Sequence, residues 1–355
     1  MSEKILMKGN EALAEAAIRA GCIRFFGYPI TPQTELAAYM AKRLPKIEGG
    51  VYLQAESEVS AINMVLGSAA SGARAMTSSS SPGISLKAEG ISYIAGSDLP
   101  CLIVNVQRAG PGLGGIQPSQ ADYWVSTRGV GHGGARLLVF APNSVQEVID
   151  LVFDAFELAE KYRIPAMILS DGLLGQMMEP VVFPDRAPVL LEKPWAANGH
   201  RDKRNKNIIN SLYLQASELE EKVRQRELRY REIEEKHSKA SEYMMDDAEY
   251  AVVSYGATSR VAGSAIDAAR EKGIRVGLIR PVTLWPFPSK QIFEKSKNLK
   301  GILAVEMSSG QMVDDVRLAV NGNCPVNFFG RTGGIIPTPM EILSEIEKMS
   351  KGDIK

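Results

Sequence analysis

The segment Cys101-Leu-Ile-Val-Asn-Val-Gln107 is apolar along almost its whole length. A strand that is apolar on both faces is typical of a parallel sheet covered by helices on each side. Up to about residue 185, short apolar runs alternate with helical patterns, which predicts an α/β fold built on a parallel sheet. Strands are expected at 22–27, 51–54, 73–78, 101–107, 136–140 and 166–170, and helices at 10–20, 33–43, from 58, at 84–95 and from 144.

The chain changes character after this first unit. Residues 180–194 are rich in proline and 217–242 are crowded with charge, whose i,i+4 pairing predicts an exposed linker helix rather than a partner-binding coiled coil. A second α/β pattern follows, with strands expected at 251–255, 275–279, 301–305 and 326–329 and a helix at 258–272. We therefore predict a domain at 1–190, a linker with a charged helix at 191–246, and a smaller domain at 247–355.

The composition excludes several classes of function. Forty-one basic and forty-one acidic side chains cancel, which argues against a nucleic-acid or anionic-membrane surface. No apolar run approaches about 20 residues and no signal-peptide pattern occurs, so we expect a cytoplasmic protein. Three scattered cysteines without a C-x-x-C pair, and three distant histidines, predict no metal site or iron–sulfur cluster in this chain.

A helix of mostly small and apolar residues is expected from Glu58 to Gly72. Such a helix is expected to be buried on nearly every face, because an amphipathic surface helix keeps a polar stripe. Glu58 is its only ionisable group and lies in the first turn, at the edge of a dry pocket. The alternative is a structural helix whose glutamate is favoured by the helix dipole. Glu56, two residues earlier, could compete for any functional role.

Polar loops follow three of the expected strands, and ligands of open parallel sheets bind at the carboxyl ends of strands. The turn Tyr28-Pro-Ile-Thr-Pro32 is stiffened by two prolines and presents the Thr31 hydroxyl. The run Ser78-Ser-Ser-Ser-Pro-Gly83 offers hydroxyls and backbone amides to an anion. In both loops, the hydroxyls could equally cap the helix that follows.

The third loop, Gln107-Arg-Ala-Gly-Pro-Gly-Leu-Gly-Gly115, follows the central strand. The Arg108 guanidinium could bind a carboxylate through two hydrogen bonds, or it could be a surface group before a flexible loop. The glycines also spell G-x-G-x-x-G, but a hydrophilic stretch follows them, and no Asp or Glu occurs between Asp122 and Glu147. A nicotinamide site is therefore a weak interpretation.

Taken together, these segments resemble one enzyme family. The chain looks like the alpha subunit of 2-oxoacid:ferredoxin oxidoreductases in the loop at 28–32, the Glu58 helix, Thr77-Ser-Ser-Ser-Ser-Pro-Gly83, Gln107-Arg-x-Gly-Pro and Arg280-Pro-Val-Thr-Leu-Trp-Pro-Phe-Pro288. Two segments look most like the 2-oxoisovalerate (branched-chain) type, namely Gly114-Gly-Ile-Gln-Pro-Ser-Gln-Ala-Asp-Tyr123 and Ile209-Asn-Ser-Leu-Tyr213. The 2-oxoglutarate type is the competitor within the family.

This resemblance implies a pyrimidine-binding domain for thiamine diphosphate (TPP), followed by a domain like the carboxyl-terminal domain of transketolase. It implies that a beta subunit supplies the Mg²⁺–diphosphate site, and that beta and ferredoxin-like subunits carry iron–sulfur clusters beside a gamma-type subunit. Glu58 would hydrogen-bond the pyrimidine ring and drive it to the imino form, while Thr31 and Arg108 would contact the substrate. Further cofactor contacts are expected at Tyr28, Pro29, Ile30 and Ser80.

One segment imitates a motif of TPP enzymes, which hold the diphosphate through Mg²⁺ on a G-D-G sequence with a downstream asparagine. Ser170-Asp171-Gly172, with Asn198 beyond, lacks the first glycine and precedes a proline-rich stretch instead of a helix. We expect Asp171 to be an ordinary residue at the end of a strand.

The resemblance implies an oxidoreductase that is active only with partner subunits. The expected reaction is the oxidative decarboxylation of a 2-oxo acid, with coenzyme A taking the acyl group and ferredoxin the electrons. A scaffold or regulatory subunit without activity is the rival interpretation. The presence of Thr31, Glu58 and Arg108 together counts against that rival.

Overall fold

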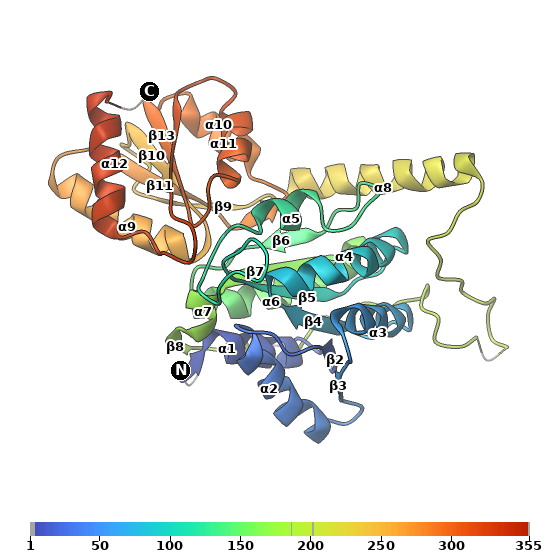
Figure 1. The fold of residues 1–355 in the computed structure, drawn as a ribbon. Coiled ribbons are helices and arrows are strands. Elements are labelled where there is room, and N and C mark those ends of the chain that lie inside the picture. Colours follow the sequence, from blue (N-terminus) through green and yellow to red (C-terminus); the bar gives the residue numbers. More distant parts are fainter. Residues whose placement is uncertain (1–3, 186, 201, 354–355) are drawn as a thin grey trace.

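The apolar run that ends at Gln107 forms β5 (Leu102–Gln107), every residue of which is buried. The computed structural model, which describes residues 4–185, 187–200 and 202–353, places β5 inside a seven-stranded sheet (Figure 1). The strand order is β12-β6-β7-β5-β4-β2-β3, and every neighbouring pair except β12 with β6 is parallel. The predicted α/β fold with a parallel sheet is confirmed.

The elements of this first unit follow the alternation in the sequence closely. Its other strands are β2 (Arg24–Gly27), β3 (Val51–Gln54), β4 (Ala75–Ser79), β6 (Leu138–Phe140), β7 (Ala166–Asp171) and β12 (Thr283–Trp285). Its helices are α1 (Gly9–Arg19), α2 (Thr34–Arg43), the 3-10 helix η1 (Leu44–Lys46), α3 (Glu58–Ala70), α4 (Ser81–Gly96), α5 (Tyr123–Arg128), α6 (Val145–Tyr162) and α7 (Gly172–Gln176). An additional antiparallel pair, β1 (Ile5–Lys8) with β8 (Met178–Val181), was not predicted from the sequence.

A second sheet has five strands in the order β14-β13-β10-β11-β9. These strands are β9 (Ala240–Tyr243), β10 (Tyr250–Val253), β11 (Val276–Pro281), β13 (Gly301–Glu306) and β14 (Val326–Gly330). The helices of this unit are α9 (Gly256–Glu271), α10 (Ser289–Ser296), α11 (Met312–Val320) and α12 (Pro339–Lys351). Only β9 is antiparallel to its neighbour, β11.

The predicted boundary at 246/247 does not separate the two sheets. Strand β12 lies within 247–355 but pairs with β6 of the first sheet, through Thr283↔Phe140 and Trp285↔Val139. Strand β9 lies within the predicted linker but belongs to the second sheet. Burial explains why β12 joins the first sheet. In this position Leu284 and Trp285 are only 1% and 5% exposed, so their apolar surface is removed from water.

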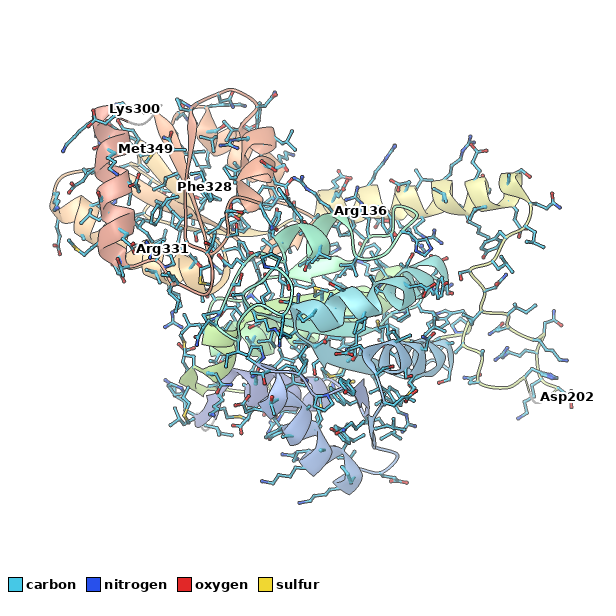
Figure 2. All side chains as sticks on the ribbon, viewed as in Figure 1. Arg136, Asp202, Lys300, Phe328, Arg331 and Met349 are labelled. Atoms are coloured by element: carbon cyan, nitrogen blue, oxygen red, sulfur yellow. The ribbon has the colours of Figure 1, made fainter. Side chains whose placement is uncertain are left out.

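The charged segment forms α8 (Ala216–His237), the long helix that reaches out beyond the first sheet in Figure 1. Its first half is exposed as predicted, and its second half packs on the first unit through the buried residues Tyr230 and Ile233. Arg226 and Arg229 form ion pairs with Asp98. Figure 2 shows Asp202 on the loop before this helix, away from both sheets. Among residues 4–185, 187–200 and 202–353, no helix combines the length and apolar character that a bilayer crossing requires.

Gln120 joins the two units at a fully buried position. Its side-chain Nε2 donates to the Tyr255 carbonyl at 2.8 Å, and its Oε1 accepts from Thr258 Oγ1 and from the Met307 amide, both at 2.9 Å. Arg280 and Glu147 add a two-bond ion pair across the same junction, at 2.7 and 2.8 Å. The second unit is therefore held at a fixed place beside the loop that follows β5.

We expect Gln120→Met to lower the free energy of unfolding by about 2–4 kcal/mol, because each buried polar group left without a partner costs about 1–3 kcal/mol. Urea unfolding of the purified chain measures this change. Gln225→Met, at an exposed position of α8, is the matched control and should stay within about 0.5 kcal/mol of the wild type. Equal effects of the two substitutions would contradict the role given to Gln120.

Candidate functional site

Three polar loops meet at one edge of the first sheet because β4 lies between β2 and β5 with all three strands parallel. The Ser78 hydroxyl donates to Gln33 Oε1, which joins the serine run to the segment after β2. The Arg108 amide donates to Ser81 Oγ at 3.0 Å, and Arg108 Nη1 donates to the Thr31 carbonyl at 3.1 Å. The structure thus brings the predicted loops together.

In the loop after β2, Tyr28, Pro29 and Thr31 are exposed at the rim, whereas Pro32 and Gln33 are buried. Gln33 is the N-cap residue of α2, and its side chain makes no capping hydrogen bond. Neither Thr31 nor Thr34 therefore has the capping role that the sequence left open. The Thr31 carbonyl accepts a hydrogen bond from Arg108, and Thr31 lines a cavity of about 550 Å³ together with Ile116, Leu173 and Met177.

The serine run is the most buried polar segment of the site. Ser79 and Ser80 are 0% exposed, and neither hydroxyl has a hydrogen-bond partner in the described part of the chain. Ser80 is the N-cap residue of α4 but makes no side-chain capping bond; the Ser81 amide instead donates to Asn105 Oδ1 at 3.2 Å. Because buried hydroxyls are normally satisfied, two orphaned ones next to each other favour a ligand site over helix capping.

Glu58 lies at the start of α3 and is 6% exposed. A Cβ placed on Gly83 would be 2.8 Å from Glu58 Oε1, so only a glycine leaves room for this carboxylate beside α4. No described residue donates a hydrogen bond to the Glu58 carboxylate. Glu56, in contrast, is exposed and accepts a hydrogen bond from the Ser60 hydroxyl, which lowers its pKa. Burial and free acceptor capacity favour Glu58 over Glu56 as the functional acid.

The expectation that the Glu58 helix is buried on nearly every face is wrong for this chain. Val59, Asn63 and Gly67 form an exposed stripe at i,i+4 spacing, and Val59 is 45% exposed. The opposite face is buried, with Ala61, Ile62 and Val65 at 0% exposure. Helix α3 therefore has a face without charge that the rest of the described chain leaves exposed.

Arg108 is only partly available to a ligand. Its Nη1 and Nη2 donate to the carbonyls of Thr31 and Leu113 at 3.1 and 3.3 Å, while its buried Nε has no partner among the described residues. Arg108 also lines a second cavity, of about 1090 Å³, with Ser81, Asp122 and the second-unit residues Met307 and Gln311. The guanidinium therefore borders the second cavity and keeps one buried donor without a partner among the described residues.

Asp171, the last residue of β7, is the N-cap residue of α7. Its Oδ1 accepts from the amides of Leu173 and Leu174 at 2.8 and 3.1 Å, which caps α7, and the Ala257 amide at the start of α9 adds a third bond. Burial raises the pKa of Asp171 to about 6 despite these bonds. In the described ranges, no group of three or more His, Cys, Asp or Glu side chains is placed to hold a metal ion.

Sequence reasoning missed one charged residue of this region. Lys87, in α4, is 0% exposed, and its Nζ donates to Thr77 Oγ1 at 2.9 Å and to the Ser78 carbonyl at 3.0 Å. The sequence signal for its burial was its position between Gly83 and Gly90. Glycines at this spacing lie on one helix face and allow a neighbouring element to approach that face closely.

Comparison with known proteins identifies the family. Residues 15–256 match the family model described as pyruvate flavodoxin/ferredoxin oxidoreductase, thiamine diphosphate-binding, and residues 248–342 match pyruvate:ferredoxin oxidoreductase core domain II. The chain belongs to the pyruvate flavodoxin/ferredoxin oxidoreductase family. The resemblance seen in the sequence is thereby confirmed, and the chain is a subunit of an oxidoreductase of this family.

Among members of this oxidoreductase family, the ketoisovalerate oxidoreductase subunit VorB of Methanothermobacter marburgensis is 49% identical over 97% of both chains. The 2-oxoglutarate synthase subunit KorA of Methanothermobacter thermautotrophicus is 36% identical over 99% of this chain and 100% of its own. The 2-oxoglutarate:ferredoxin oxidoreductase of Magnetococcus marinus, solved with 2-oxoglutarate, coenzyme A and succinyl-CoA, has a TM-score of 0.86 at 26% identity. This chain covers 65% of that one, with 98% of its own length aligned. A split-gene transketolase (TM-score 0.63, 13% identity, 97% and 98% coverage) shares the fold.

We expect Asp171→Asn to gain stability relative to the wild type as the pH rises from about 4 to about 6. The folded wild type keeps its proton up to about pH 6, whereas the unfolded chain loses it near the ordinary value of 3.8, so folding of the wild type weakens across this window. Urea unfolding at about pH 4 and about pH 7 measures the difference, with the exposed Asp202→Asn as control. Loss of Mg²⁺ binding by the Asn variant would show instead that Asp171 is a metal ligand.

Proposed function

We propose that this chain is the pyrimidine-binding subunit of a TPP-dependent 2-oxoacid:ferredoxin oxidoreductase. The observation that carries the proposal is the buried carboxylate of Glu58, which receives no hydrogen bond from the described residues, beside two orphaned hydroxyls, Ser79 and Ser80. Buried polar groups without partners are rare in folded proteins, and functional sites are a main exception. The family match over 15–256 supplies the ligand class that fits them.

The branched-chain type is the better-supported substrate class. The ketoisovalerate oxidoreductase subunit is 49% identical to this chain, against 36% for the 2-oxoglutarate synthase subunit, at nearly complete coverage of both. The reaction would be the oxidative decarboxylation of a 2-oxo acid such as 2-oxoisovalerate, with coenzyme A as acyl acceptor and ferredoxin as electron acceptor. The 2-oxoglutarate type remains the second candidate, because the solved 2-oxoglutarate:ferredoxin oxidoreductase shares the fold at a TM-score of 0.86.

The residues of this chain fit the pyrimidine end of TPP. When bound, the cofactor supplies the nucleophilic carbon and the electron sink for loss of carbon dioxide. Glu58 would hydrogen-bond the pyrimidine nitrogen and exchange a proton with it, because its carboxylate is buried and receives no hydrogen bond from the described residues. Ser80, with Tyr28, Pro29 and the half-buried Ile30 of the loop after β2, would complete the contact around the ring.

The diphosphate end fits a partner subunit. Asp171 already accepts three backbone amides, so it is a poor substitute for the Mg²⁺ motif. The exposed Val59, Asn63 and Gly67 stripe of α3 lies on the helix that starts with Glu58, and a beta subunit covering it would bring its diphosphate–Mg²⁺ site to the same cofactor. Iron–sulfur clusters would belong to the beta and ferredoxin-like subunits, in a complex that also contains a gamma-type subunit.

Substrate binding is assigned to Arg108 and Thr31. The Arg108 Nη2 donates to the Leu113 carbonyl at 3.3 Å, a weak partner that a charged ligand can replace. Thr31 lies next to this guanidinium, through its carbonyl, and it lines the neighbouring cavity. A 2-oxo acid held here would have its carboxylate neutralised while its carbonyl faces the cofactor.

We expect Glu58→Gln to lower turnover of the reconstituted complex by at least about 100-fold, because the amide cannot exchange a proton with the ring. The assay uses 2-oxoisovalerate, 2-oxoglutarate and pyruvate with coenzyme A and a one-electron acceptor. Glu56→Gln is the matched control and should keep near-wild-type turnover. Normal turnover in the Glu58 variant with TPP bound would contradict the assignment, and a preference for 2-oxoglutarate would replace the branched-chain type.

We expect Arg108→Lys to raise the KM for the 2-oxo acid about tenfold or more, because lysine keeps the charge but loses the two-point hydrogen bonding. TPP affinity should change little. Steady-state kinetics and cofactor titration separate the two effects, and Arg224→Lys on the exposed part of α8 is the control. If only the TPP affinity changed and the KM for the 2-oxo acid did not, Arg108 would contact the cofactor and not the substrate.

A further inference from the structure

Lys87 is a buried cation that the proposed mechanism leaves without a role. It is 0% exposed, and lysine is almost never fully buried unless it is paired. Its Nζ has two neutral hydrogen-bond partners, Thr77 Oγ1 and the Ser78 carbonyl, at the carboxyl end of β4. Removing an ammonium group from water is costly, so its retention at this place points to a counter-charge nearby.

The packing of α3 on α4 places that lysine beside Glu58. On α4, Gly83, Lys87 and Gly90 follow each other at i,i+4,i+7 and share one face. A Cβ on Gly83 would meet Glu58 Oε1 at 2.8 Å, and a Cβ on Gly90 would meet Ile62 Cγ2 at 2.4 Å. Lys87 therefore lies between the two points where α3 touches α4, on the face turned toward Glu58.

Glu58 is the charged group that faces Lys87. It is the only ionisable residue of α3, while β4 and β5 contain none. On α4 itself, Glu89 is exposed and bound to the Tyr93 hydroxyl. Burial lowers the pKa of Lys87 to about 7, and the Glu58 charge opposes this shift.

We propose that the positive charge of Lys87 stabilises the carboxylate form of Glu58 and so helps Glu58 pass its proton to the pyrimidine nitrogen of TPP. The proposal rests on the proposed function for the ring, but the interaction between the two side chains exists without the cofactor. Lys87 is thus a positioning residue, because it acts through Glu58. The proton leaves a Glu58 oxygen, and the ring nitrogen receives it.

A double-mutant cycle in the cofactor-free full chain tests the interaction. Lys87→Met, Glu58→Gln and the double variant are unfolded in urea at about pH 6, where the lysine is charged. We expect the effects on the unfolding equilibrium constant to be non-additive by about tenfold. The coupling should fade by about pH 9, since Lys87 loses its charge as the pH rises through about 7. Additive effects at both pH values would overturn the proposal.

Lys87→Gln separates charge from hydrogen bonding. The glutamine amide keeps a donor for Thr77 and Ser78 but carries no charge. If Lys87 acted only through these hydrogen bonds, the Gln variant would keep the wild-type coupling to Glu58. The proposal predicts that Gln behaves as Met does. Where Lys87→Met prevents folding, Lys87→Gln takes its place in the cycle, and Lys42→Met on the exposed side of α2 is the control.

The second measurement is a circular-dichroism pH titration of the aminopyrimidine bound to the reconstituted complex. We expect the apparent pKa of the ring to fall by about one unit in both Lys87 variants and to stay unchanged in Lys42→Met. An unchanged ring pKa would overturn the proposal. A complex that binds no TPP would overturn the proposed function, whereas the cycle in the cofactor-free chain would still decide whether the two side chains interact.

Discussion

The parallel pairing of β4 between β2 and β5 is the constraint on which the site depends. The register Ser79↔Asn105 brings the serine run level with the end of β5, and Arg24↔Ala75 aligns β2 with the same strand. Asn105 then uses its side chain to bind the Ser81 amide and Asp122 Oδ2, which ties the start of α4 to the segment before α5. A shift by one residue would turn these polar side chains to the other face of the sheet.

Three buried carboxylates of this chain differ in the hydrogen bonds that they accept, and this difference separates structural groups from a functional one. Asp171 accepts three backbone amides, and Glu306 accepts the amides of Gln311, Met312 and Val313 together with the Ser308 hydroxyl. Burial raises the pKa of both groups, and the amide donors oppose that rise. Glu58 is also buried, at 6% exposure, but no such donor occurs for it among the described residues. The same physical rule that makes Asp171 and Glu306 structural makes Glu58 the group that needs a ligand.

The sequence predicts what depends on local pattern. Strands β2 to β7 and the clustering of their loops follow from apolar runs, turn residues and the geometry of parallel sheets. The pairing of β12 with β6 and the burial of Gln120 between the units depend on contacts more than 100 residues apart in the chain, such as Thr283 with Phe140 and Gln120 with Tyr255. The exposed stripe of α3 escaped prediction for another reason: apolar composition cannot say whether the covering surface belongs to the same chain.

The junction between the units has a consequence for the substrate side of the site. The loop after β5 begins at Arg108, and Gln120 holds its far end against Tyr255, Thr258 and Met307. Tyr123 adds a hydrogen bond to Asp315 at 2.5 Å, from the same end of the loop. The glycine-rich stretch between these ends carries Leu113, whose carbonyl accepts a hydrogen bond from Arg108. The same loop therefore contacts the second unit at its far end and the Arg108 guanidinium near its start.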